Sequence, residues 1–74
     1  MSHPPSVYIV FLALKEAGRA MRHADLHEQT KLPKRTLRFA VRRLQELELL
    51  TTKRSLKDTR IAYFILKPGA KLEA

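Results

Sequence analysis

Hydrophobic positions recur at helical spacing over the first two thirds of the chain and give way to β-branched and aromatic runs in the last third. The first helical stretch covers residues 7–17. It begins after the breaker Pro4-Pro5, with Ser6 placed to cap it, and stops at Gly18, which suits the left-handed position beyond a helix end. One arc of this helix predicts a core face, formed by Val7, Val10, Phe11, Leu14 and Ala17.

A second arc of the same helix is also hydrophobic, which is more than a small isolated domain needs. It consists of Tyr8, Ile9 and Leu12. A structural explanation is that this arc is buried under the C-terminal strands or is ordinary apolar surface. The other explanation, which also stays open, is contact with a second subunit. A strand over residues 7–14 is the competing structure, but the length between the proline pair and the glycine favours a helix.

Two further helical stretches follow, separated by a tight turn. Residues 23–31 predict a short helix, flanked in the core by Met21 and Leu32. Pro33 disfavours a helical conformation at Leu32 and suits the first turn of a new helix, which we predict over residues 33–48. The apolar arc of this third helix comprises Leu37, Ala40, Val41, Leu44 and Leu47.

The remainder of the chain predicts a β-hairpin. A polar stretch, residues 55–59, separates two runs with strand character, and the second run ends at Pro68-Gly69. We therefore expect one α+β domain over residues 1–74. It has an N-terminal arm over 1–5, a hairpin with a charged tip over 50–66, and a C-terminal tail over 67–74.

Composition narrows the function classes. The 74 residues carry 15 Lys+Arg against 7 Asp+Glu, a formal net charge of +8, which favours polyanionic partners. A domain of this size buries roughly 60% of its unfolded surface, too little for a deep catalytic cleft. The chain has no cysteine, which excludes disulfides and cysteine zinc sites, and its longest apolar run is far short of the roughly 20 residues that span a bilayer.

The positive charge is concentrated in the middle of the chain. Residues 1–30 sum to zero, residues 31–60 sum to +7, and the last fourteen add +1. On the third predicted helix, the side opposite the apolar arc carries five basic residues from Lys34 to Arg43 with no acid among them. Such a one-sided distribution is typical of a nucleic-acid-binding surface.

Three segments, in this order, resemble the winged helix-turn-helix domain of MarR-type prokaryotic regulators. They are Leu32-Pro33-Lys34-Arg35-Thr36-Leu37, residues 41–50, and residues 55–60 with Leu66. Such regulators often carry an aspartate and an arginine two apart in the wing and a leucine six residues later, the spacing of Asp58, Arg60 and Leu66. The resemblance implies three helices followed by a two-stranded β-hairpin wing. Lys31 stands where many such motifs have glycine, so a left-handed lysine is expected there.

The resemblance places the third helix in the major groove of duplex DNA and the wing on the adjacent minor groove or backbone. Arg35, Arg38 and Arg42 are then expected to contact bases, since arginine can donate two parallel hydrogen bonds to guanine; phosphate contact or a solvated face is the alternative. Phe39 would contact a thymine methyl or be covered by arginine stems. The full expected DNA-binding set is Lys34, Arg35, Thr36, Arg38, Phe39, Arg42, Arg43, Lys53, Arg54, Lys57 and Arg60.

Within that set, Lys34 and Thr36 lie in the first helical turn and are assigned to the DNA backbone. In the wing, Lys53, Arg54 and Lys57 are expected to straddle the minor groove. Asp58 is expected to orient Arg60 or Arg54 rather than to touch DNA. A charged tip that prevents edge-to-edge association is the alternative for the wing.

Metal binding and catalysis are not expected. His23 and His27 have the i, i+4 spacing of helical metal ligands, but no cysteine is present and no glutamate lies between them. We expect His23 near the helix cap and His27 against the third helix. No nucleophile and base pattern or glycine-rich phosphate loop is visible, so we predict no enzyme activity and no cofactor.

The leading hypothesis is a cytoplasmic, nucleoid-associated transcriptional regulator of a prokaryote or archaeon that binds double-stranded DNA sequence-specifically. We expect it to form a homodimer through Tyr8, Ile9 and Leu12, without membrane contact. The sequence lacks the long terminal helices between which MarR-type proteins bind effectors, so no effector site is expected. The alternatives are a non-specific architectural or plasmid-partition protein that coats DNA, a protein-interaction winged helix and, more weakly, an RNA-binding protein.

Overall fold

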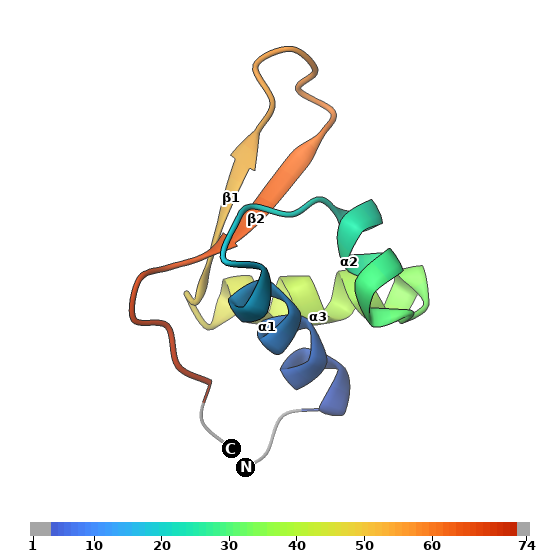
Figure 1. Cartoon of the computed structure of the whole chain (residues 1–74), viewed down its shortest axis with the longest axis vertical. Helices are drawn as coiled ribbons and strands as arrows, with labels where there is room; N and C mark the ends of the chain where they lie inside the picture. The colour runs from blue at the N-terminus through green and yellow to red at the C-terminus, as the bar shows by residue number, and fades with distance from the viewer. Residues whose placement is uncertain (1–3, 73–74) are drawn as a thin grey trace.

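The computed structural model describes residues 4–72, which form three helices followed by an antiparallel hairpin (Figure 1). The helices are α1 (Pro5–Ala17), α2 (His23–Thr30) and α3 (Lys34–Glu46), and the hairpin pairs β1 (Leu50–Arg54) with β2 (Ala62–Leu66). This order confirms the predicted winged helix-turn-helix. Residues 1–3 of the predicted arm and 73–74 of the predicted tail lie outside the described residues.

Helix α1 starts two residues before its predicted start at residue 7. Pro5 occupies the first turn, where the missing amide hydrogen costs nothing, and the Val7 N–H donates to the Pro4 carbonyl at 3.0 Å. The expectation that Ser6 caps the helix is therefore wrong, since Ser6 lies inside it. The predicted stop is confirmed: Gly18 has φ of 63° and its N–H donates to the Leu14 carbonyl.

Left-handed residues precede and follow α3, and neither is glycine. Lys31 and Glu48 both have φ of 61°. Helix α2 therefore ends one residue before the predicted 31, and α3 is shorter than the predicted 33–48. The N–H groups of Glu48 and Leu49 donate to carbonyls of the last turn of α3, which closes the helix and turns the chain into β1.

The core lies where the three helices meet the base of the wing. The predicted core positions of α3 up to Leu44 are buried, and Leu47 is half-buried. On α1, Ala13 is buried, whereas the predicted Ala17 is only partly so. The complete buried set is Val7, Val10, Phe11, Ala13, Leu14, Met21, Leu26, Leu37, Ala40, Val41, Leu44, Leu50 and Phe64. In the described part of the chain, no helix is long and apolar enough to cross a membrane.

The wing is attached to the helices through Met21. Its N–H donates to the Phe64 carbonyl at 2.8 Å, and its carbonyl accepts the Phe64 N–H at 2.7 Å. The hairpin register pairs Leu50 with Leu66, and its free end projects along the 40 Å axis of the molecule (Figure 1). In the described part of the predicted tail, Ala70 and Leu72 pack against the core.

The second apolar arc of α1 is not covered by the C-terminal strands. Ile9 is 41% exposed and Leu12 is 52% exposed, while Tyr8 is half-buried. Burial beneath the strands is therefore the wrong explanation for this arc. A hydrophobic strip on α1 faces solvent next to the last turn of α2.

The left-handed lysine generates a stability prediction. Lys31→Gly should stabilise the fold by about 0.5–1 kcal/mol, because relief of the strained backbone exceeds the entropy that glycine adds to the unfolded chain. Glu48→Gly should act in the same direction. Urea unfolding measures both changes.

The matched control for these variants is Lys15→Gly, an exposed residue inside α1. Glycine at a right-handed helical position should destabilise the protein by roughly 0.5–1 kcal/mol. If Lys31→Gly also lowered the free energy of unfolding, the left-handed backbone would not be strained.

Candidate nucleic-acid interface

Helix α3 presents a continuous basic side to solvent. Its buried positions recur every three or four residues and fix the helix against α1 and α2. All expected contact residues of α3 are exposed except Thr36, which is half-buried. Phe39 is 49% exposed, so other side chains of the chain do not fully cover its ring.

A shallow groove separates α3 from the wing, and arginines line both of its walls. We call it the α3–wing groove. Arg38 and Arg42 come from α3, whereas Arg54 and Arg60 come from the wing. None of the described residues lining the groove is acidic. Four guanidinium groups that are distant in sequence are thus brought to one depression, which is a suitable site for a polyanion.

Strand alternation decides which wing residues face α3. Thr52 and Arg54 lie on the same face of β1 and line the α3–wing groove. Lys53 lies between them in sequence and therefore points to the opposite face of the hairpin. The Gln45 amide nitrogen donates to the Thr52 hydroxyl and links the C-terminal half of α3 to β1.

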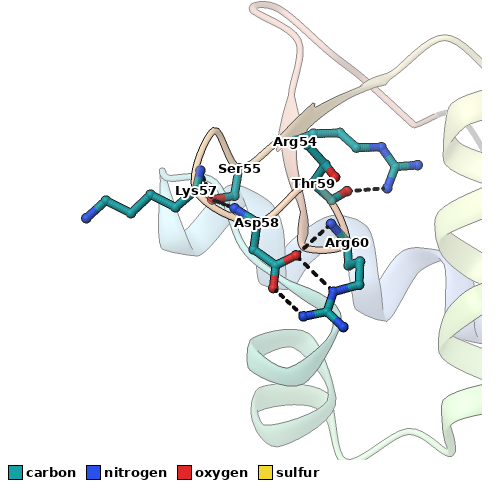
Figure 2. A network of polar contacts seen from close by, with 6 residues as sticks. All are labelled: Arg54, Ser55, Lys57, Asp58, Thr59 and Arg60. Atoms are coloured by element: carbon teal, nitrogen blue, oxygen red, sulfur yellow. Dashed lines mark hydrogen bonds and ion pairs between the residues drawn. The ribbon is translucent and has the colours of Figure 1, made fainter.

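The tip of the wing is organised by its own polar contacts (Figure 2). Asp58 accepts two hydrogen bonds from the Arg60 guanidinium, at 3.1 and 3.2 Å, and a third from the Arg60 backbone N–H at 3.0 Å. Arg54 donates to the Thr59 carbonyl at 3.0 Å. Of the two expected partners of Asp58, the one that it contacts is Arg60.

This pairing also shifts the titration of Asp58. The Arg60 guanidinium and backbone N–H donate hydrogen bonds to the carboxylate and hold the pKa of Asp58 below its ordinary value. Asp58 therefore stays ionised to a lower pH than an ordinary aspartate and is paired with Arg60 at neutral pH. A guanidinium held in this way loses less side-chain entropy when it binds a second anion.

His23, in the first turn of α2, is one of the residues that line the α3–wing groove. Its ring contacts Phe64 edge to face, with centroids 4.7 Å apart. Burial lowers the pKa of His23, and the positive charge of Arg38 lowers that pKa further. His23 is therefore neutral at neutral pH.

His27 does not share the position of His23. It is exposed, and its Nδ1–H donates to the Leu32 carbonyl at 2.7 Å. A second hollow, between α2 and α3, is lined by both histidines together with Glu28, Lys34 and Arg38. Within residues 4–72, no group of three or more His, Cys, Asp or Glu side chains is placed to hold a metal ion.

The structure gathers only part of the predicted set. Of the expected DNA-binding residues, Arg38, Arg42, Arg54 and Arg60 line the α3–wing groove, whereas Lys34, Arg35, Thr36, Phe39, Arg43, Lys53 and Lys57 do not. Sequence reasoning missed three polar residues in its wall, His23, Gln45 and Thr52. Gln45 could have been found, because it follows Arg38 and Arg42 at helical spacing; His23 and Thr52 give no such signal.

Comparison with solved structures assigns the fold to a class of regulators. The chain is similar to Bordetella bronchiseptica BpsR, whose DNA binding is regulated by 6-hydroxynicotinic acid, at 25% identity and a TM-score of 0.81. The match covers 90% of this chain and 50% of BpsR. The PcaV transcriptional regulator of Streptomyces coelicolor matches at 25% identity and a TM-score of 0.79, over 90% of this chain and 47% of PcaV.

A third match names the family. Lactococcus lactis ZitR, a zinc-responsive MarR family member, is 24% identical with a TM-score of 0.79, over 95% of this chain and 47% of ZitR. The structural neighbours of this chain are thus MarR-family transcriptional regulators, and its fold is that of their winged DNA-binding domains. The chain spans about half the length of these neighbours. No family model matches the sequence, and no curated protein matches it either.

The wing contacts predict a measurable change in the titration of Asp58. Arg60→Gln removes the guanidinium that holds this pKa down, so the Asp58 pKa should rise toward its ordinary value of 3.8. Carboxyl carbon shifts followed by NMR against pH measure the pKa.

Asp25 provides the internal control for this titration. Its pKa is held down by a backbone hydrogen bond from Arg22, which the wing substitution does not touch. An Asp58 pKa that stays unchanged in the Arg60→Gln protein would show that the two side chains are not paired in solution.

Proposed function

We propose that this chain is a transcriptional regulator that binds double-stranded DNA sequence-specifically, with α3 in the major groove and the wing on the adjacent minor groove. The observation that carries the proposal is the acid-free α3–wing groove, lined by Arg38, Arg42, Arg54 and Arg60. The MarR-family neighbours support the DNA-binding role. No catalytic role is proposed, since these neighbours are regulators.

Base recognition is assigned to α3. An α-helix fits the width of the major groove, and arginine can donate two parallel hydrogen bonds to the O6 and N7 atoms of guanine. Arg35, Arg38 and Arg42 are the proposed base contacts, and Phe39 is placed among them for a thymine methyl group. Lys34, Thr36 and Arg43 are assigned to phosphates.

The wing is assigned to the minor groove and its backbone. Arg54 and Lys53 lie on opposite faces of β1, so the hairpin can contact both walls of the minor groove. Arg60, held by Asp58, and Lys57, near the tip, complete the basic set of the wing (Figure 2). Leu56 is fully exposed at the same tip, a feature that the charge pattern did not indicate.

Dimerisation is part of the proposal. A single winged domain contacts few base pairs, whereas a two-fold dimer doubles the recognised site. The strip of Tyr8, Ile9 and Leu12 on α1, in which Ile9 and Leu12 are exposed and Tyr8 is half-buried, is the proposed contact surface. Such a regulator would act in the cytoplasm, at the nucleoid. We propose no effector, although BpsR responds to a small molecule and PcaV binds a natural ligand.

The function is tested by selecting binding sites from random duplex DNA. On the selected site, Arg38→Ala or Arg42→Ala should cost about 1–3 kcal/mol and relax base preference locally, because a base contact is lost. Lys53→Ala should weaken all sequences alike, and the slope of log K against log salt should fall by roughly 0.9. Fluorescence anisotropy at several salt concentrations measures these values.

The matched control is Lys15→Ala, which removes the same charge from the exposed side of α1 and should leave base preference intact. Equal losses of affinity on selected and random DNA would show that the two arginines contact phosphates rather than bases. Selection without any preferred site would favour a protein that coats DNA, and the absence of binding would favour a protein-interaction domain.

The dimer is tested by charge insertion into the exposed strip. Leu12→Glu should shift the protein from dimer to monomer in sedimentation velocity, because the new carboxylate would be buried at the interface. Leu56→Glu, at the fully exposed wing tip, is the control and should leave the assembly unchanged. A wild-type protein that sediments as a monomer both free and bound to DNA would contradict the dimer.

A further inference from the structure

The position of the α3–wing groove on DNA follows from the two proposed contacts, α3 in the major groove and the wing on the adjacent minor groove. In B-form DNA, one phosphodiester strand separates the major groove from the adjacent minor groove. If α3 occupies the first and the wing the second, that strand has to pass between them. The residues lining the α3–wing groove, rather than the arginine tips alone, then face backbone phosphates.

His23 is the titratable residue of this groove that can change its charge near neutral pH. It is half-buried, and its ring is fixed edge to face on Phe64, which the Met21 bridge holds in the sheet. The imidazole therefore has little freedom to leave the groove when a phosphate enters.

Basic side chains outnumber acidic ones around His23. Two arginines of α3, Arg38 and Arg42, and two of the wing, Arg54 and Arg60, share the α3–wing groove with it. The hollow on its other side contains Lys34 of α3 and, on its own helix, His27 and the one acid, Glu28. Asp58 is engaged by Arg60. In the free protein, burial and then the positive charge of Arg38 disfavour a charged imidazole.

A bound phosphate strand reverses this balance. Phosphate oxygens carry full negative charge, partly neutralise the four arginines and accept hydrogen bonds from an imidazolium. We propose that the α3–wing groove binds the backbone strand between the two DNA grooves and that His23 takes up a proton when it does so. This inference rests on the proposed function, and it adds His23 to the DNA contacts.

Proton uptake makes DNA binding depend on pH. Binding is tighter below the pKa of His23 in the complex, and the gain is complete below the pKa of the free protein. Affinity therefore rises as pH falls, by up to about tenfold for each unit that separates the two pKa values. At most one proton is taken up at His23 per chain.

The experiment uses a random-sequence duplex of about 20 base pairs at fixed salt, because the contact is with backbone and the salt effect must be held constant. Binding of the wild type should tighten several-fold between about pH 7.5 and about pH 5.5. His23→Gln should abolish this pH dependence, whereas His27→Gln, the matched control on the same helix, should keep it.

A second measurement does not depend on the folding of a variant. NMR titration of the imidazole signals of the wild type should give a higher His23 pKa in the DNA complex than in the free protein.

Two results would overturn the inference while leaving the proposed function intact. These are an unchanged His23 pKa in the complex and a pH dependence that His23→Gln retains. Absence of duplex binding at both pH values would overturn the proposed function and this inference together.

Discussion

Two backbone hydrogen bonds between Met21 and Phe64 couple the helical half of the chain to the wing. A two-stranded hairpin is marginally stable alone in water, so this one needs a surface to pack on. Phe64 provides that packing because it is the buried residue of β2, and Leu50 has the same role in β1. The distance between α3 and the wing, and hence the α3–wing groove, depends on this attachment.

Periodicity predicted the helices and their buried sides because core packing imposes the spacing that a pattern reveals. The bounds were less predictable, since they depend on single backbone conformations: Pro5 extends α1 at its start, and Glu48 ends α3 early. The second arc of α1 shows a different limit. Hydrophobicity identified Ile9 and Leu12, but exposure depends on whether another element covers them, which the local pattern does not record.

The candidate site, too, was predictable from the sequence only in part. The charge pattern identified the arginines of α3 and the wing, because long basic side chains without acidic neighbours are conspicuous in a sequence. The α3–wing groove itself was not predictable, since it arises where α3, the first turn of α2 and the hairpin meet. His23 and Thr52 belong to it only through this tertiary arrangement, and the one-residue alternation of β1 separates Lys53 from Arg54. The strand register decides which of these two side chains faces α3.

The gathering of four arginines at one depression also affects the fold that presents them. Like charges held close together repel, and this repulsion is largest in the free protein at low salt. A polyanion that fills the depression removes the repulsion and binds only the folded chain, so occupancy adds to the stability of the fold by mass action. The bound and folded states of this small domain are therefore thermodynamically linked, and a bound polyanion would stabilise the fold without any new contact within the chain.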